Sequence, residues 1–326
     1  MSIALPPGLP ARATLKIEGV EVLTADELRR RGGALRICFV NLMPNKVATE
    51  TQICRLLGAT ALPVAVTLCL PDSYRSKSTP ASHIAAFYQP WSRIRDEPFD
   101  GLVVTGAPVE TFPFEAVTYW PELTTIFDWA RSHVASSFYI CWAAQAALYH
   151  FHAVPKHGLA AKMFGVFRHR ATSANSPLLK GLGEEFPVPV SRHTEVRAGD
   201  LPARAGLTVL AESPQTGLCL VEDRENRAVC MFNHLEYDAG TLRDEFLRDR
   251  LAGKPVAIPA NYFPDDDPTR FAVNVWRPAA SLLFDNWLRE IRRTASPSIV
   301  DAPTAHDGSD LPVTAFGRFP ADVLHR

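Results

Sequence analysis

The sequence predicts an α/β protein, a doubly wound and mostly parallel β-sheet flanked by helices. Up to residue 150, short apolar runs alternate with longer segments of helical periodicity, which is the order expected of such a sheet. The apolar runs are continuous instead of alternating with polar residues, and this indicates strands that are buried on both faces. Beyond residue 150 the runs are shorter and are separated by turns, so further strands are expected there.

Alternating strands and helices account for the first half of the chain. The segment 1–34 is Pro-rich and then charged, and is interpreted as an N-terminal extension with a short capped helix near 24–28. The elements expected after it are strand 36–40, helix 49–57, strand 64–70, helix 81–88, strand 101–105, helix 120–132 and strand 137–140, with a helix from residue 142. Loops at the carboxyl ends of such strands are where α/β proteins bind ligands.

The second half is expected to contain more strands and two helices. The predicted strands are 185–190, 207–210, 217–221 and 228–232, and the predicted helices are 241–251 and 279–293. We expect residues 35–295 to form a single α/β domain, since a chain of this length can bury one large core. Residues 296–326 are rich in Pro, Ala, Asp and Gly, which is typical of a mobile tail.

The composition favours a protein that acts on small molecules. Of the 326 residues, 47% are hydrophobic and 21% are charged, and 34 basic side chains nearly balance 35 acidic ones. This balance argues against nucleic acid or membrane partners, and no apolar stretch is long enough to span a membrane. The N-terminus does not resemble a signal peptide, and the six cysteines are scattered without a Cys-x-x-Cys pair, so a reducing, cytoplasmic location is expected.

The stretch 137–148 changes from strand-like to helix-like residues at Cys141. No Gly, Pro or Asn relaxes this turn, so the chain must turn sharply and project the sulfur above the edge of the sheet. There the sulfur faces the positive end of a helix dipole, which favours the nucleophilic thiolate. The alternative is that Cys141 only fills the core, because cysteine is one of the most buried residue types.

His234 follows the strand 228–232 in the same kind of position, and Glu236 comes two residues later. An imidazole can take and return the proton of a thiol near neutral pH, and a carboxylate that orients it would complete a Cys-His-Glu triad. His-x-Glu also occurs by chance, so His234 could instead pack at the surface or cap a helix. Two strand ends that separately offer a nucleophile and a base favour the catalytic interpretation.

Seven motifs carry a resemblance to a known family. They are Asn-Leu-Met-Pro at 41–44, Thr-Glu-Thr-Gln at 49–52, the segment 99–108, Tyr-Trp-Pro at 119–121, the segments 141–148 and 234–238, and Asn-Tyr-Phe-Pro at 261–264. In order and spacing they closely resemble the homoserine O-acyltransferases of methionine biosynthesis, also called homoserine transsuccinylases. The resemblance implies a fold similar to the class I glutamine amidotransferases, which is flavodoxin-like.

The resemblance implies a ping-pong acyl transfer. Cys141 would attack the thioester of an acyl-CoA, which is a co-substrate, and His234, oriented by Glu236, would then activate the hydroxyl of L-homoserine. The amide N–H of Trp142 is expected in the oxyanion hole. The family pattern adds Lys46 there, which otherwise would be a solvated lysine. No cofactor besides the acyl-CoA is implied, and family members are commonly homodimers.

The resemblance also assigns residues to the acceptor and to the donor. Family residues that contact the amino acid substrate fall on Lys162, Ser191 and Arg248, and a guanidinium at Arg248 suits an α-carboxylate. In place of Glu110, a glycine would leave room for a succinyl carboxylate. Glutamate fills that room and repels the charge, at a cost of about 1–4 kcal/mol. Glu110 therefore favours acetyl-CoA, unless its side chain points to solvent.

Departures from the family pattern leave alternatives open. The segment 233–236 reads Asn-His-Leu-Glu where relatives usually have Gly-His-Pro-Glu, and the segments 168–170 and 192–194 also differ. L-Serine as acceptor and succinyl-CoA as donor are therefore the competing substrates. Glutamine amide hydrolysis and a non-catalytic homologue are the other hypotheses. No metal site is expected, because the histidines at 150, 152 and 157 are irregularly spaced.

Overall fold

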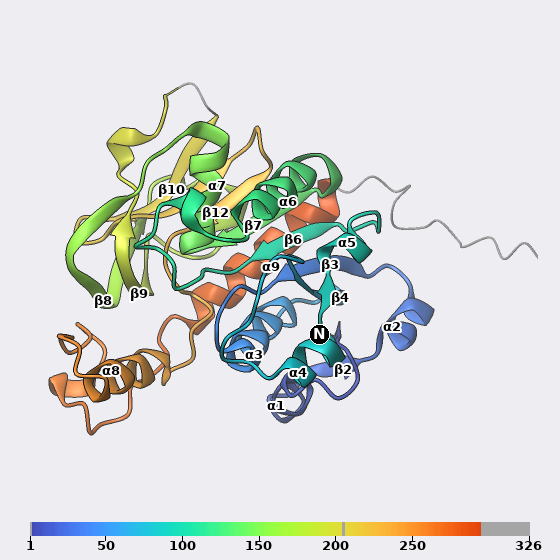
Figure 1. Cartoon of the computed structure of the whole chain (residues 1–326), viewed down its shortest axis with the longest axis horizontal. Helices are drawn as coiled ribbons and strands as arrows, with labels where there is room; N and C mark the ends of the chain where they lie inside the picture. Colours follow the sequence, from blue (N-terminus) through green and yellow to red (C-terminus); the bar gives the residue numbers. More distant parts are fainter. Residues whose placement is uncertain (1, 204–205, 295–326) are drawn as a thin grey trace, which may run out of the picture.

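One β-sheet crosses the described part of the chain, residues 2–203 and 206–294 of a computed structural model (Figure 1). Its twelve strands run in the order β2-β1-β4-β3-β6-β7-β12-β11-β10-β8-β9, with β5 beside β4. The pairs from β2 to β12 are parallel. The pairs from β12 to β9 are antiparallel. The sheet is therefore mostly parallel, with an antiparallel extension at one side.

The strands and helices have the following bounds. The strands are β1 Ser2–Ala4, β2 Glu21–Leu23, β3 Leu35–Val40, β4 Val64–Leu70, β5 Gln89–Pro90, β6 Gly101–Val104, β7 Ser136–Ile140, β8 His157–Ala171, β9 Glu185–Glu195, β10 Leu207–Ser213, β11 Gly217–Asp223 and β12 Ala228–Met231. The helices are α1 Ala11–Ile17, α2 Ala25–Arg31, α3 Lys46–Leu57, α4 Ala81–Phe87, α5 Trp91–Ile94, α6 Trp120–His133, α7 Trp142–His152, α8 Thr241–Leu251 and α9 Arg277–Thr294. Within the described residues, no helix is both long and apolar enough to cross a membrane.

The predicted parallel half of the sheet is confirmed. Strand β4 and helix α8 have the bounds expected from the sequence, and β3, β6 and β7 differ from expectation by one residue at an end. All four residues of β6 are buried, as a continuous apolar run predicts for a strand with helices on both faces. Helix α2 starts after Thr24, whose side chain and that of Glu27 form a capping box.

Successive residues of β7 show that both faces of the sheet are covered. Phe138 packs against Phe284 and Trp287 of α9, with ring centroids 4.7 and 5.4 Å apart. Tyr139 points to the opposite face, where its ring lies 5.0 Å from that of Phe127 in α6. Since neighbouring side chains of a strand point to opposite faces, α9 and α6 must lie on opposite sides of the sheet. The predicted doubly wound arrangement is thus confirmed.

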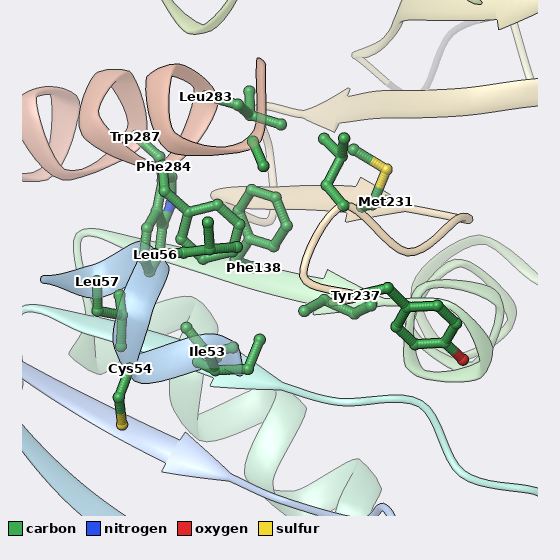
Figure 2. Close-up of a cluster of buried hydrophobic side chains, with 14 of the residues drawn as sticks. Ile53, Cys54, Leu56, Leu57, Phe138, Met231, Tyr237, Leu283, Phe284 and Trp287 are labelled. Carbon is green, nitrogen blue, oxygen red and sulfur yellow. The ribbon is translucent and has the colours of Figure 1, made fainter. Parts of the chain in front are cut away.

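Figure 2 shows the first of these two cores, where helices α3 and α9 meet the sheet. Ile53 and Leu57 of α3 belong to the same buried cluster as Leu283 of α9. This packing fixes α3, and with it the loop between β3 and α3, against the sheet. That loop ends at the same edge as the Cys141 turn, so the core supports one wall of the site described below.

Two parts of the chain differ from the sequence-based expectation. The segment 1–34 was expected to precede the domain, but β1 pairs with both β2 and β4 and so extends the sheet itself. A three-residue strand is too short for its periodicity to be recognised. The 15-residue strand β8 was not expected, because it is rich in Arg, His and Lys and is partly exposed. The predicted tail, 296–326, lies outside the described residues.

Candidate active site

Cys141 occupies a strained turn between β7 and α7. Its φ of 53° and ψ of −116° lie in a region that residues with a side chain rarely adopt, and its N–H donates to the Met231 carbonyl at 2.7 Å. All six cysteines fall in the described part of the chain, and five are buried whereas Cys141 is partly exposed. The sharp turn predicted from the sequence is therefore confirmed, and the sulfur lies at the N-terminus of an 11-residue helix.

His234 reaches Cys141 because β7 and β12 are neighbouring strands. Ile140 pairs with Met231, so the residues that follow both strands emerge at the same edge of the sheet. The imidazole Nδ1 lies 2.6 Å from Glu236 Oε1, and both side chains are buried. The ring also stacks on Tyr237, with centroids 4.2 Å apart. These contacts fix the imidazole, and they leave Nε2 as the nitrogen that can serve the thiol.

The surroundings of His234 favour the imidazolium form. Burial alone would lower its pKa, but the negative charges of Cys141 and Glu236, and hydrogen bonds with both, raise the pKa of His234 well above its usual value. In general, an imidazolium beside a cysteine favours a thiolate–imidazolium pair. That pair is the reactive form for nucleophilic attack.

Trp142 and Gly106 shape the space next to the sulfur. The Trp142 side chain is fully buried, and its backbone N–H is the first of helix α7. A Cβ added to Gly106 would lie 3.1 Å from the Cys141 Cβ and 3.6 Å from the Trp142 nitrogen. Glycine therefore keeps the space beside the sulfur open. The expected oxyanion role of the Trp142 amide stays a prediction.

A cavity of about 270 Å³ joins most of the predicted site residues. It is lined by Cys141 and His234 together with the four residues assigned to the two substrates, Glu110, Lys162, Ser191 and Arg248. These residues come from segments far apart in the chain: the loop after β6, the turn before α7, strands β8 and β9, the segment after β12, and α8. Glu236 and Trp142 are buried behind the lining residues they support.

The cavity contains an acidic residue that sequence reasoning missed. Glu245 of α8 accepts hydrogen bonds from Lys162 Nζ at 3.1 Å, from Ser191 Oγ at 2.6 Å and from the Tyr237 hydroxyl at 3.1 Å. Its neighbour Asp249 lies one helical turn later, 3.4 Å from the same lysine nitrogen. The spacing i, i+4 of two acids on a predicted helix was a usable signal, but the partner strand β8 was not expected.

Comparison with known proteins identifies the family. A family model described as homoserine O-succinyltransferase matches residues 2–296. The chain belongs to the homoserine O-succinyltransferase family. It is 51% identical over 320 residues to a homoserine O-acetyltransferase of Rhizorhabdus wittichii, covering 97% of this chain and 100% of the relative. A homoserine O-acetyltransferase of Hyphomonas neptunium is 52% identical over 291 residues, covering 89% and 95%.

Solved structures with a similar fold are glutamine amidotransferases. The match to one from Thermotoga maritima has a TM-score of 0.50 at 14% identity and covers 79% of this chain and 98% of that one. The match to one from Methylobacillus flagellatus also has a TM-score of 0.50 at 14% identity, with 79% and 95% covered. Such distant likeness shows the fold alone. It confirms the class I glutamine amidotransferase-like fold expected for the homoserine O-succinyltransferase family.

The names in the homoserine O-succinyltransferase family refer to two acyl groups. The family model is described as a succinyltransferase, whereas the two relatives are named acetyltransferases. Glu110, the residue expected to separate them, lines the cavity, and its carboxylate forms no ion pair among the described residues. Lys156 donates to the carbonyl oxygens of Glu110 and Phe112, at 2.5 and 2.6 Å, and so fixes the turn that carries the carboxylate.

Lys46, which the resemblance placed in the oxyanion hole, is fully buried. Its Nζ donates to the carbonyl oxygens of Asn41 and Met43 at 2.6 and 3.2 Å, and burial lowers the pKa of Lys46 to about 7. It is absent from the residues that line the cavity. In this structure the amine thus holds the loop between β3 and α3, because the loop carbonyls take up its hydrogen bonds. The oxyanion role of Lys46 stays a prediction.

Proposed function

We propose that this protein transfers an acetyl group from acetyl-CoA to the hydroxyl of L-homoserine, in methionine biosynthesis, through an acyl-Cys141 intermediate. The observation that carries the proposal is the arrangement at the cavity. A partly exposed cysteine on a strained turn meets a buried histidine that is fixed by a carboxylate. Membership of a homoserine acyltransferase family supplies the substrate class.

In the first half-reaction, the Cys141 thiolate attacks the thioester carbonyl carbon of acetyl-CoA. The carbonyl oxygen becomes negatively charged, and the Trp142 amide N–H is the donor proposed to stabilise it. When the bond to the CoA sulfur breaks, the electron pair leaves with that sulfur, and the His234 imidazolium supplies its proton. CoA departs as a thiol, and a neutral imidazole remains beside the acetyl-cysteine.

In the second half-reaction, that neutral imidazole acts as the base. His234 takes the proton from the homoserine hydroxyl, whose oxygen attacks the acetyl carbon. The bond to the Cys141 sulfur then breaks, and the electron pair returns to the thiolate. The starting thiolate–imidazolium pair is restored, so each proton and electron pair is accounted for. Glu236 keeps the imidazole oriented through both steps.

The charged end of the cavity suits an amino acid. The Arg248 side chain is 63% exposed, and its ion-pair partner Asp249 also contacts Lys162 and Lys254. Arg248 is therefore available for the α-carboxylate of homoserine. Glu245 offers a carboxylate to the α-ammonium group, in place of its hydrogen bond from Lys162 or Ser191. Two opposite charges at fixed positions orient the acceptor so that its hydroxyl points toward Cys141.

Acetyl is the favoured donor group because Glu110 faces the same cavity as Cys141. A succinyl chain would bring its own carboxylate toward that of Glu110. Like charges in a partly buried site cost on the order of 1–4 kcal/mol, which is enough to set the preference. Succinyl-CoA is the competing donor, since it matches the description of the family model. L-Serine is the competing acceptor, because one methylene changes binding by only about 1–3 kcal/mol.

Intact-protein mass spectrometry tests the proposal directly. The protein is incubated with acetyl-CoA or succinyl-CoA, and then with homoserine or serine. We expect a mass increase of one acetyl group that is absent in Cys141→Ala and that homoserine removes. A succinyl adduct formed in preference would contradict the role of Glu110, and discharge by serine alone would contradict the acceptor. No adduct with either donor would reject the acyl-enzyme mechanism, and ammonia release from glutamine would favour amide hydrolysis over acyl transfer.

A further inference from the structure

A second, larger cavity opens beside the Cys141 cavity. It has a volume of about 770 Å³, within the usual range for small-molecule sites, and we call it the donor groove. Its walls come from the segments 42–44, 73–78 and 108–119, which follow the carboxyl ends of β3, β4 and β6. Pro44 and Pro108 line both the donor groove and the Cys141 cavity. A long ligand can therefore lie in the groove with one end at the sulfur.

We propose that the donor groove binds the pantetheine arm and the nucleotide part of CoA. This inference rests on the proposed function, because it takes acyl-CoA as the substrate of Cys141. It adds the place and the residues by which the much larger CoA portion is held. The Cys141 cavity, at about 270 Å³, is lined by the residues assigned to the acyl group and the amino acid, so the remainder of the donor must lie elsewhere.

The inner part of the donor groove is apolar, as a pantetheine arm requires. Leu42, Val117 and Tyr119 are buried in its wall, and the Tyr74 and Tyr119 rings lie 5.3 Å apart. The Tyr74 hydroxyl can donate to the Leu42 carbonyl at 3.3 Å, which joins two segments of the groove wall. Apolar walls with few polar groups are typical of sites that bind an extended alkyl-amide chain.

The outer part of the donor groove exposes the aromatic ring of Phe112. Phe112 is 55% exposed although it is a large hydrophobic residue, and it lies on the groove. The hydrogen bonds from Lys156 to the carbonyls of Glu110 and Phe112 hold the backbone of this turn. An exposed aromatic face at a groove rim is suited to stack on a nucleobase. In CoA, adenine is the planar group at the end farthest from the thioester, so it is the part of the donor that would reach Phe112.

Positive charge marks the place of the phosphates. Arg75 and Lys77 line the groove, no Asp or Glu is among its lining residues, and neither cation has an ion-pair partner in the described ranges. The Arg75 guanidinium donates only to backbone carbonyls of its own loop, those of Asp72 and Tyr74. Two cations without acidic partners beside an apolar groove are complementary to the phosphate groups of CoA.

The loop that carries these cations is held in place before any ligand binds. Glu122 of α6 accepts hydrogen bonds from the N–H groups of Asp72 and Ser73 at 2.6 and 2.8 Å. At the other end, the Thr79 hydroxyl donates to the Pro44 carbonyl at 2.9 Å. A wall fixed in this way loses little conformational entropy on binding, which favours a preformed donor site.

Kinetics with two donors test the assignment. Acetyl-CoA is compared with S-acetyl-pantetheine, which has the same thioester and arm but no nucleotide. We expect Arg75→Ala/Lys77→Ala to raise KM for acetyl-CoA about tenfold or more, because charged hydrogen bonds to phosphate are lost. KM for S-acetyl-pantetheine and for homoserine is expected to stay unchanged. Phe112→Ala is expected to show the same selective loss through the adenine.

A matched control and a binding experiment separate this inference from the proposed function. Lys16→Ala/Arg30→Ala removes the same two charges from exposed positions on α1 and α2, outside both cavities, and is expected to leave KM unchanged. Titration of Cys141→Ala with CoA measures the groove without acyl transfer, and the Arg75/Lys77 substitutions are expected to weaken that binding. Unchanged CoA affinity and unchanged KM would overturn the groove even if Cys141 is acylated. Lost CoA affinity without any acylation would support the groove and reject the proposed function.

Discussion

Gly106 shows how the absence of a side chain prepares the catalytic space. Its position next to the Cys141 Cβ and the Trp142 nitrogen leaves a gap, and the proposed mechanism requires the attacked carbonyl to fit there. A methyl group at this position would be tighter against Cys141 than ordinary van der Waals contact. The consequence falls on the reaction more than on the fold, because the gap lies at the surface of the site.

Gly106→Ala is expected to slow acetylation of Cys141 by about tenfold or more, since small displacements of reacting groups have large effects on rate. The rate of adduct formation by mass spectrometry measures this effect. The free energy of unfolding in urea serves as the control and is expected to change little. Acetylation at the wild-type rate would show that the space beside Gly106 is not used by the donor.

In the proposed reaction, the charge of Glu110 lies where a longer acyl chain would end. Glu110→Gly is expected to raise kcat/KM for succinyl-CoA relative to acetyl-CoA by about tenfold or more, because a like-charge contact of roughly 1–4 kcal/mol is removed. Parallel assays with both donors measure the ratio. Glu110→Gln keeps the size and removes the charge, so it separates repulsion from lack of room. A ratio that neither substitution changes would contradict the role of Glu110 in donor choice.

At the scale of elements, strand β8 brings polar groups into the interior that the pattern of the chain did not reveal. His169 is fully buried, with Nε2 2.9 Å from the Thr216 hydroxyl and Nδ1 3.0 Å from the Phe167 carbonyl oxygen. Arg192 on the paired strand β9 is buried too, and donates to the Thr194 carbonyl at 3.1 Å. The antiparallel hairpin thus depends on buried hydrogen bonds as well as on apolar contacts.

The buried His169 predicts a loss of stability in acid. Burial, with a smaller effect of the Arg192 charge, lowers the pKa of His169 from 6.5 to about 4. The unfolded chain therefore binds this proton first, so the contribution is intact above the unfolded pKa and is lost as pH falls toward about 4. The loss between about pH 7 and pH 5 is on the order of 2 kcal/mol. Urea unfolding at both pH values measures it, and His169→Gln is expected to reduce the difference. Equal pH dependence in both proteins would contradict this account.

The order of elements was predictable where local signals are strong, and less so elsewhere. Strand β4 is a continuous apolar run, and α8 begins and ends as its sequence suggests, because each is recognised from neighbouring residues alone. Strand β1 has three residues and depends on pairing with β4, which lies some sixty positions away in register. Strand β8 depends on pairing with β9 and β10, and its polar sequence lacks the alternation by which a strand is recognised.

The candidate site divides in the same way. Cys141 and His234 follow apolar strands, and the rule that strand ends share an edge was enough to bring them together. Glu245 was missed because its partners Lys162 and Ser191 reach it only through the β8–β9 hairpin. The oxyanion role expected of Lys46 stays a prediction. Its hydrogen bonds to the loop that precedes it were not foreseen, because they depend on tertiary burial that the sequence does not display.

At the scale of the whole molecule, one acidic residue ties the segment after β12 to helices α3 and α9. Asp238, four residues after His234, lies 2.7 Å from Arg55 of α3 and 2.8 Å from Arg277 at the start of α9. Arg55 also contacts Glu18 at 2.6 Å, in the segment between β1 and β2. The N-terminal part of the chain is thereby connected, through two ion pairs, to the segment that carries His234.

Arg55→Met is expected to lower the free energy of unfolding by about 1–2 kcal/mol, because Arg55 is mostly buried whereas its acidic partners are partly exposed to screening solvent. Urea denaturation measures the change. Arg29→Met is the matched control, since Arg29 pairs with Asp26 at a fully solvated position and is expected to change stability by less than about 0.5 kcal/mol. Equal effects of the two substitutions would show that the network does not stabilise the fold.

The distribution of the cysteines allows the number of intact sites in a sample to be measured by alkylation. Since five thiols are enclosed in the core and one lies at the cavity, an alkylating reagent in excess should stop after a single equivalent. The amount bound then equals the number of competent sites in a preparation, whichever acyl donor or acceptor the enzyme uses. The same selectivity makes Cys141 the thiol that oxidants reach most readily. If Cys141 is the nucleophile, as proposed, the activity of a stored sample depends on keeping that one sulfur reduced.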